Sequence, residues 1–255
     1  MSTSGKTIDE DWFSTAFDAL YPIIYAHRTV EAAAPEAAFA IAQTGIGPED
    51  HVLDLCCGNG RHLLHLLTHT AHAMGLDYSP DLLRMARQSV GPDAVLFRAD
   101  MRAIPLAGTC DVVLNFFTSF GYFQDEAENL AVLQGIAAAL KPTGRFFLDY
   151  LNPSRVADTL VPHSERSAGV YCVVEDRWID EASHRINKCT VVRQGGREVS
   201  RSGESVRLYS AGEMREMLAQ AGLHVWKCFG DYAGSTYDER QERMIILGGK
   251  TPRNA

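Results

Sequence analysis

Three acidic residues end three consecutive β-rich segments of the chain, and a glycine-rich turn follows the first of them. Asp54 lies in HVLDLC, Asp77 ends HAMGLD, and Asp100 follows AVLFRA. Carboxylates at these places can accept hydrogen bonds from hydroxyl and amino groups of a polar ligand. In the turn, Gly58 and Gly60 let the backbone approach that ligand without a Cβ atom in the way. The pattern predicts a site of the nucleotide-binding type.

The elements that must position these residues alternate between short β-rich runs and longer amphipathic ones. We expect strands at 51–56, 72–77, 94–99, 111–116 and 145–150, and helices at 61–69, 80–90 and 125–140. Such alternation predicts βαβ units and a mostly parallel, doubly wound sheet. Ligands bind at the carboxyl ends of the strands in such sheets, so the three carboxylates are expected along one edge.

The remaining segments do not follow this alternation of strands and helices. Residues 1–44 carry apolar residues at helical spacings, with breaks expected at Pro22 and Pro35. Antiparallel strands are expected at 170–179, 185–192 and 197–209, then a helix at 212–221 and a closing hairpin of strands at 223–230 and 243–249. We expect one domain over 1–255, in these parts: an N-terminal helical cap (1–44), a ligand-binding core (45–150), an antiparallel β insert or cap (152–208) and the end of the core (209–250).

Composition narrows the classes of partner. The chain has 24 Lys and Arg against 32 Asp and Glu, and its basic residues are scattered, which disfavours nucleic acid as a partner. The start of the sequence lacks the basic and apolar regions of a secretory signal, and no stretch approaches the roughly 20 apolar residues that span a bilayer. We therefore expect a cytoplasmic protein with no nucleic-acid or membrane partner.

The segment VLDLCCGNGRH resembles the glycine loop of the class I S-adenosylmethionine-dependent methyltransferases. That loop has an acidic residue followed by three alternating small residues, usually glycines. Here these are Asp54, Cys56, Gly58 and Gly60, so cysteine replaces the first glycine. The segment LKPTGRFFLDYLNP matches the family's fifth-strand region, and the resemblance as a whole covers about 45–150 and 209–249.

The resemblance implies an α/β fold: a Rossmann-like, doubly wound, seven-stranded, mostly parallel sheet with an antiparallel last strand, plus a small antiparallel β insert. It also implies an enzyme that binds S-adenosyl-L-methionine and releases S-adenosyl-L-homocysteine. Asp77 would bind the ribose, Tyr78 would flank the adenine, and Arg28 suits the methionine carboxylate. The cofactor-binding residues implied are Tyr25, Arg28, Asp54, Cys56, Gly58, Asn59, Gly60, Asp77, Tyr78, Asp100, Met101, Asn115 and Phe116.

The methyl acceptor is expected to be a small molecule, bound where the aromatic segment NFFTSFGYF (115–123) follows the fourth strand. The alternative for this segment is a hydrophobic loop that covers the core. The candidates for substrate binding are Phe117, Thr118, Ser119, Phe120 and Asp231. The candidates for catalysis are Tyr122, Tyr232 and Tyr237. Nitrogen is slightly favoured over oxygen as the methylated atom, because no motif for a general base is present.

Several alternatives stay open. A dinucleotide dehydrogenase would need a third glycine where Leu63 stands. A catalytically inactive, cofactor-binding regulatory or assembly protein would keep the same carboxylates. The insert resembles the cap of glycine/sarcosine and deoxyaminosugar N-methyltransferases, and it could equally be the dimerisation sheet of a homodimer. The histidines from His62 to His72 are interpreted as a solvated helix face, so no metal site is expected.

Overall fold

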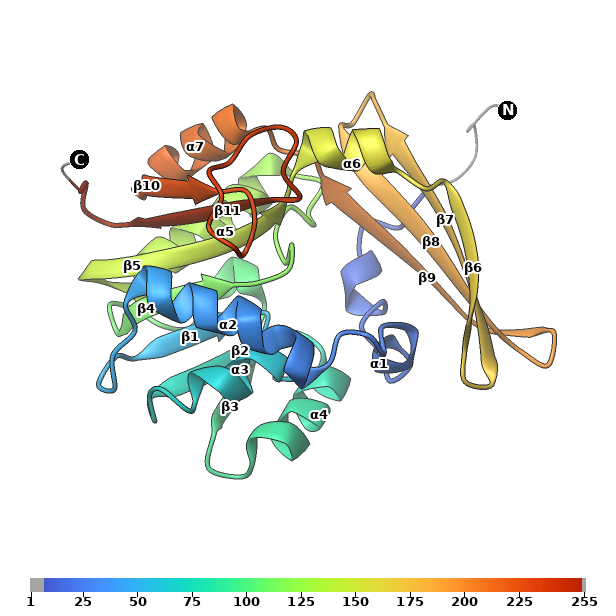
Figure 1. Ribbon diagram of the computed structural model, residues 1–255, viewed down its shortest axis with the longest axis horizontal. Helices are drawn as coiled ribbons and strands as arrows, with labels where there is room; N and C mark the ends of the chain where they lie inside the picture. Colours follow the sequence, from blue (N-terminus) through green and yellow to red (C-terminus); the bar gives the residue numbers. More distant parts are fainter. Residues whose placement is uncertain (1–6, 254–255) are drawn as a thin grey trace.

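The computed structural model describes residues 7–253 and contains two β-sheets joined by short connections (Figure 1). Residues 1–6 and 254–255, which belong to the predicted cap and to the end of the chain, lie outside the described residues. One sheet is the seven-stranded core, and the other is a four-stranded sheet that stands to one side of it (Figure 1).

The seven-stranded sheet has the strand order β10-β11-β5-β4-β1-β2-β3. Its strands are β1 (Val52–Leu55), β2 (Ala73–Asp77), β3 (Val95–Arg98), β4 (Cys110–Asn115), β5 (Leu140–Leu151), β10 (His224–Phe229) and β11 (Arg243–Gly249). The pairs among β1 to β5 are parallel, whereas β11 pairs antiparallel with both β5 and β10. The predicted fold class, including its antiparallel last strand, is therefore confirmed.

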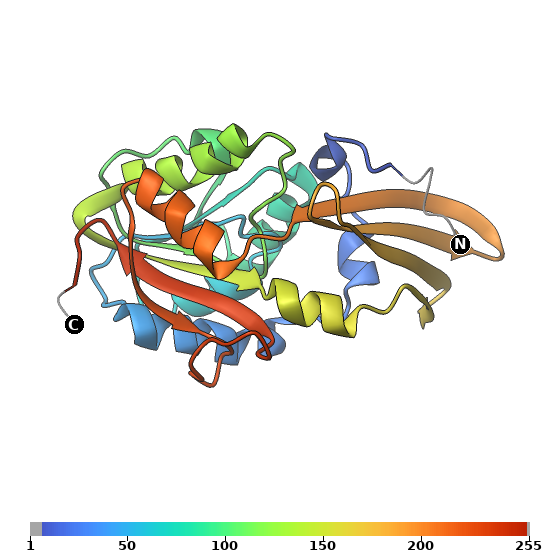
Figure 2. The same ribbon diagram turned by 90° about the horizontal axis from the view of Figure 1, so that it is seen from above.

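Helices cover both faces of this sheet, with α2 on one face and α5 and α7 on the other (Figure 2). The helices are α1 (Tyr21–Ile24), α2 (Val30–Thr44), α3 (Arg61–Leu66), α4 (Pro80–Val90), α5 (Glu126–Ala139), α6 (Pro153–Thr159) and α7 (Ala211–Gln220), with 3₁₀ turns η1 (Trp12–Ser14) and η2 (Met101–Ala103). Buried apolar side chains form one cluster on each face of the sheet, so the sheet is the middle layer of the core.

Local chemistry explains where the longer helices begin. The side chains of Thr29, Ser79, Asp125 and Ser210 each accept a hydrogen bond from a backbone N–H in the first turn of the helix that follows. The expected break at Pro35 is wrong: α2 runs through this residue. Pro22 lies in the first turn of α1, where a missing N–H is tolerated.

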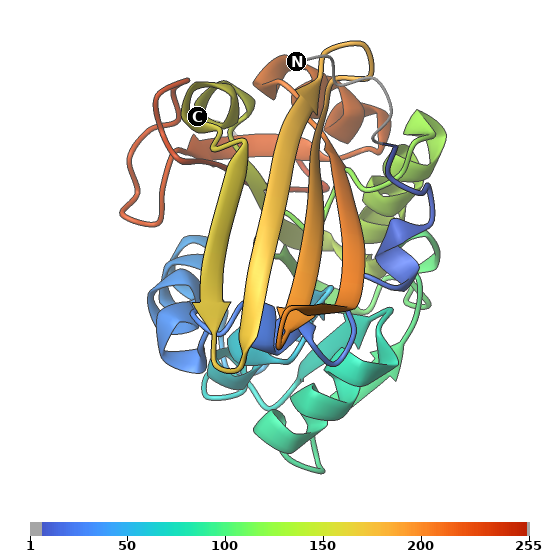
Figure 3. The same cartoon turned by 90° about the vertical axis from the view of Figure 1, so that its right-hand side faces the viewer.

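The insert is a four-stranded antiparallel sheet in the order β6-β7-β8-β9 (Figure 3). Its strands are β6 (His163–Ala168), β7 (Tyr171–Asp180), β8 (Arg185–Gln194) and β9 (Arg197–Arg207). The sequence predicted three of these strands and missed β6 and the preceding α6. Strand β6 is HSERSA, an edge strand with one short apolar residue, so it lacks the apolar alternation that identifies a strand.

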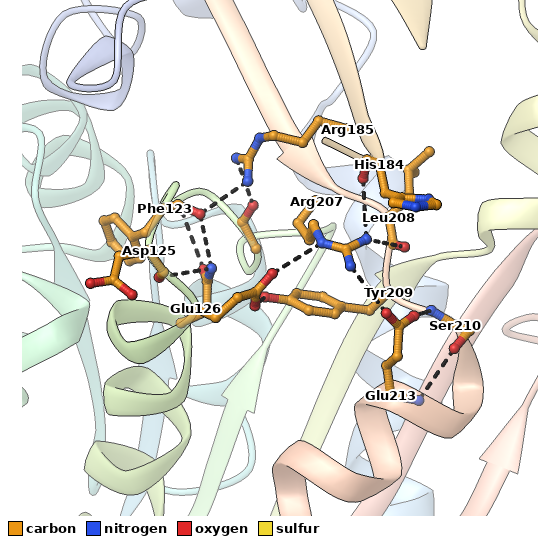
Figure 4. A network of polar contacts seen from close by, with 12 residues as sticks. Phe123, Asp125, Glu126, His184, Arg185, Arg207, Leu208, Tyr209, Ser210 and Glu213 are labelled. Atoms are coloured by element: carbon orange, nitrogen blue, oxygen red, sulfur yellow. Dashed lines mark hydrogen bonds and ion pairs between the residues drawn. The ribbon is translucent and has the colours of Figure 1, made fainter. Parts of the chain in front are cut away.

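Polar contacts fix the insert to the core where β8 and β9 meet the loop before α5 (Figure 4). Arg185 is buried, and its guanidinium donates to the backbone oxygens of residues 121, 122, 123 and 205 at 2.8–3.1 Å. Arg207 donates to Glu126 and Glu213, each at 3.0 Å, and so links β9 to α5 and α7. These bonds set the position of the insert above the carboxyl ends of the core strands.

Candidate active site

A cavity of about 770 Å³ lies at the carboxyl ends of β1 to β4, between the core sheet, the N-terminal segment and the inner face of the insert. The core supplies the loops after β1, β2, β3 and β4. The N-terminal segment supplies an aromatic wall that includes Phe13, Phe17 and Tyr21, and the insert supplies Arg177, Ile186, Lys188, Glu204 and Val206. The site is thus assembled from the whole length of the chain.

Asp77, at the end of β2, forms hydrogen bonds that fix the backbone of the glycine loop. Its carboxylate accepts hydrogen bonds from the backbone N–H groups of Gly58 and Ser79, both at 2.8 Å, and the residue is 7% exposed. Burial raises the pKa of Asp77 despite these bonds. A carboxylate has about four acceptor positions, so about two remain for a ligand in the cavity.

Two buried oxygens under this loop have no hydrogen-bond partner: Asp54 Oδ2 at the end of β1 and Asn115 Oδ1 at the end of the adjacent β4. Burial, together with nearby Asp77, outweighs the effect of Arg61 and raises the pKa of Asp54 to about 8. A buried acceptor without a hydrogen-bond partner lowers the stability of the fold unless a ligand or water donates to it. These strand ends therefore fit a ligand that carries donors or a positive charge.

The third strand end is held by an ion pair. Burial raises the pKa of Asp100, but hydrogen bonds from Arg102 lower it more, so the net shift is downward. Arg102 also pairs with Glu128 and lies 5.5 Å from the ring centroid of Phe13. Tyr78 is partly exposed at the end of β2 and has the guanidinium of Arg98 over its ring. An aromatic ring and a carboxylate therefore face this end of the cavity from neighbouring strands.

The wall after β4 has an unusual backbone. Phe117 and Thr118 adopt left-handed conformations, with φ of 59° and 62°, which non-glycine residues rarely do. The buried carboxylate of Asp149 accepts from the backbone N–H of Phe117 at 2.7 Å, and its backbone oxygen accepts from the N–H of Thr118 at 2.9 Å. Strain of this kind persists where the surroundings hold it in place, commonly at functional sites.

The Phe117 ring lies among three cations. The guanidinium carbons of Arg28, Arg61 and Arg243 are 4.6, 4.8 and 5.3 Å from its centroid. Arg61 pairs with Glu36, and Arg243 pairs with Asp149. Arg28 instead donates to the hydroxyl of Tyr21 at 2.7 Å, and its Nε has no partner. Arg28 is thus the member of this group best placed to receive an anionic group of a ligand.

The insert places an ion pair against the same cavity. Lys188 Nζ is 2.7 Å from Glu204 Oε1, and the Tyr25 hydroxyl donates to the same oxygen at 2.9 Å. Burial raises the pKa of Glu204, but the charge and hydrogen bond of Lys188 lower it more, so Glu204 is ionised at neutral pH. Burial, with nearby Glu204, raises the pKa of Tyr25, and burial also raises that of Tyr122, so both phenols are protonated.

Most of the predicted cofactor and substrate residues meet at this cavity. Those that line it are Tyr25, Arg28, Cys56, Gly58, Asn59, Asp77, Tyr78, Asp100, Met101, Phe116, Phe117, Thr118, Ser119 and Tyr122. Asp54 and Asn115 lie beneath the lining. A Cβ on Gly60 would be 3.2 Å from side-chain atoms of Ala86 and Val90, so this glycine allows α3 to approach α4.

Four predicted residues lie elsewhere. Phe120 is fully buried in the core against Tyr150 and Tyr209, so it does not wall the cavity as expected. The loop between β10 and β11 does not reach the cavity: its members Asp231, Tyr232 and Tyr237 are absent from the lining. Asp231 accepts from N–H groups of its own loop, Tyr232 donates to Asp149 at 2.7 Å, and the Tyr237 hydroxyl is 3.5 Å from Asn152 Oδ1.

The interpretation of the histidines as a solvated face is wrong for His62. This residue is 4% exposed, lines the cavity, stacks on Phe116 at 4.0 Å between ring centroids, and lies 2.6 Å from Glu36 Oε2 through Nε2. The reason is that α2 packs over α3 and covers the face taken to be solvated. Burial lowers the pKa of His62 more than Glu36 raises it.

Sequence reasoning also missed Glu204, Lys188 and Arg243. They lie in regions without a motif, and a single charged residue in a strand is usually solvated. Lys188 and Glu204 lie directly opposite each other in the β8–β9 pair, which only the register of the two strands reveals. Among residues 7–253, the six cysteines are free, no group of His, Cys, Asp and Glu is arranged to hold a metal ion, and no helix is long and apolar enough to cross a bilayer.

Comparison of the sequence with known proteins finds methyltransferases. Residues 52–144 match the family described as a methyltransferase domain. The chain is 30% identical over 203 residues to a cypemycin N-terminal methyltransferase of a Streptomyces species, covering 77% of this chain and 81% of that protein. It is also 30% identical over 197 residues to a dTDP-3-amino-3,4,6-trideoxy-α-D-glucopyranose N,N-dimethyltransferase of Streptomyces venezuelae, covering 76% and 72%.

A solved structure shares the fold. Cofactor-bound CalS10, an amino pentose methyltransferase from Micromonospora echinaspora, superposes with a TM-score of 0.69 at 22% identity, covering 91% of this chain and 97% of that one.

Proposed function

Because this chain belongs to the S-adenosylmethionine-dependent methyltransferases, we propose that it methylates an amino nitrogen of a small molecule bound between the β4 loop and the insert. Family membership decides against a dinucleotide dehydrogenase. The single observation that carries the choice of nitrogen is Glu204, an ionised carboxylate of the insert that lines the cavity and is held by Lys188 and Tyr25.

The residues at the ends of the core strands indicate which part of the cavity would take the cofactor. When bound, S-adenosylmethionine supplies an electrophilic methyl group on a sulfonium. Asp77 would use its free acceptor positions for the two ribose hydroxyls, and Tyr78 and Asp100, which line the cavity at the neighbouring strand ends, would contact the adenine. Arg28 would pair with the methionine carboxylate, and the orphaned oxygen of Asp54 would accept a hydrogen bond from the positively charged end of the cofactor.

The part of the cavity around Glu204, which we call the acceptor half, suits an amine better than a hydroxyl. An amine attacks in its neutral form and needs orientation and a nearby proton acceptor, whereas a hydroxyl benefits from a strong base. Glu204 provides a carboxylate for an ammonium or amine N–H, and Lys188 and Tyr25 hold it in place. Tyr25 and Tyr122 both line the cavity as neutral phenols, since burial raises the pKa of each, so neither serves as a phenolate base.

The relatives support the same choice. Of the two relatives, one is an N-terminal methyltransferase and the other is an N,N-dimethyltransferase of an amino sugar. Both names describe methylation at nitrogen. This shared methylated atom is what we carry over to the present chain.

The test compares matched acceptors. Amino sugars and short peptides, each with the hydroxyl compound of the same skeleton, would be incubated with methyl-labelled S-adenosylmethionine, and the products would be assigned by mass spectrometry. We expect label on amines only. Glu204→Gln should lower kcat/KM for the amine by at least about tenfold, the worth of one charge-assisted hydrogen bond, with cofactor affinity unchanged.

Glu198→Gln is the matched control, because Glu198 lies on the same strand but pairs with Arg201 on the surface, outside the cavity. Label on the hydroxyl compounds would refute the choice of nitrogen. Tight cofactor binding with no transfer to any compound would favour the inactive binding protein instead.

A further inference from the structure

A second hollow, of about 440 Å³, lies between α6 and the first strands of the insert. It is lined by Val156, Thr159, Leu160, Val161, Ser164, Arg177 and Ile186. Nothing in the proposed reaction uses it. We refer to it as the α6 groove.

The α6 groove adjoins the acceptor half of the main cavity. Val156, Arg177 and Ile186 line both hollows, so side chains of these three residues form the boundary between them. Two of the three are short aliphatic side chains. An apolar extension of an amine held near Glu204 would reach the α6 groove by passing the side chains of Ile186 and Val156, which border both hollows.

The chemistry of the α6 groove is apolar. Val161 is 56% exposed and lines the groove beside three other aliphatic residues, so the groove presents apolar surface to solvent. Among the described residues that line the groove, Arg177 alone is charged, and its guanidinium is already bonded to Glu175 at 2.6 Å and to Ser164 Oγ at 3.0 Å. The groove thus has exposed apolar surface to cover and no unpaired cation for a phosphate.

We infer that the α6 groove is a distal subsite for the methyl acceptor and takes an apolar extension of the amine. The inference rests on the proposed function and narrows it: the acceptor has an amino group at one end and an apolar body at the other, rather than a phosphorylated tail in this groove. The geometry that carries it is the shared boundary together with the exposed Val161.

The test uses linear primary amines from propylamine to octylamine as probes. Their affinity for the protein saturated with S-adenosylhomocysteine would be measured by calorimetry, and their methylation would be measured with S-adenosylmethionine. Once the chain passes the boundary, we expect affinity to rise by up to about fourfold for each added methylene, the usual worth of a buried CH₂.

Two surface variants make a matched pair. Val161→Asp places a charge in the α6 groove, whereas Val170→Asp places the same charge at a 70% exposed valine in the turn after β6, which lines neither hollow. The gain with chain length should be lost in the first variant and kept in the second.

Every other outcome either supports or contradicts the proposed subsite or the proposed function. A gain with chain length that is equal in all three proteins overturns the subsite, and so does failure of octylamine to bind. Length-dependent binding that Val161→Asp abolishes, without methylation of any amine, supports the groove and contradicts the proposed function. Methylation that does not respond to chain length supports the function and overturns the groove.

Discussion

Asp54 should make cofactor binding depend on pH in a specific direction. Burial raises the pKa of this carboxyl to about 8 in the free protein, and its Oδ2 has no partner. S-adenosylmethionine brings positive charge to the loop above Asp54, which favours the ionised carboxylate and lowers its pKa. Binding should therefore release a proton below pH 8, and by linkage the affinity should increase as the pH rises.

The size of the change in affinity follows from the protonation of Asp54 in the free and bound states. With a free-state pKa of about 8 and an ionised bound state, the dissociation constant should increase about fivefold from pH 8 to 7 and about tenfold from pH 7 to 6. Calorimetric titration at these three pH values gives the constant. Repeating the titration at pH 7 in buffers of different ionisation enthalpy gives the number of protons released, which should be close to one.

Asp54→Asn is the matched control because it keeps the shape of the protonated side chain. The variant should bind weakly at all three pH values, close to the wild type at pH 6, and should release no proton through this group. Titration of the cofactor's own amino group affects both proteins equally and cancels in the comparison. A wild-type affinity that is flat from pH 6 to 8, or an equal slope in the variant, would refute the reasoning.

Three further predictions concern other parts of the site. Asp77→Ala should weaken binding of S-adenosylmethionine by about 10- to 100-fold in calorimetry, because at least one bond to a charged acceptor is lost. Gly60→Ala should lower the free energy of unfolding in urea by about 1–3 kcal/mol more than Gly45→Ala; both glycines have left-handed backbones, but only Gly60 faces close neighbours. Tyr232→Phe should lower the free energy of unfolding by about 1–3 kcal/mol, through its lost bond to Asp149, and leave methyl transfer nearly unchanged, whereas loss of a general base would slow transfer about 100-fold or more.

The sequence predicted the core well because its signals are local. A strand, a glycine turn and a helix follow one another within about a dozen residues, and the apolar periods of the strands and helices identify the elements directly. The predicted α/β fold, family, activity and cofactor are confirmed. The elements it missed, α6 and β6, are short and largely polar, so their place depends on the neighbours to which they bond.

The sequence alone determined which strand ends carry the predicted cofactor residues, and the tertiary structure decided which residues face them across the cavity. Asp77 and Asp100 reach one edge because parallel strands carry their carboxyl ends there, whatever the loops do. Tyr25 and Glu204 are 179 positions apart and meet only because Arg185 and Arg207 fix the insert above that edge. Periodicity tells which face of an element is apolar but not which other element will cover it, and this is why His62 and Phe120 were both misplaced.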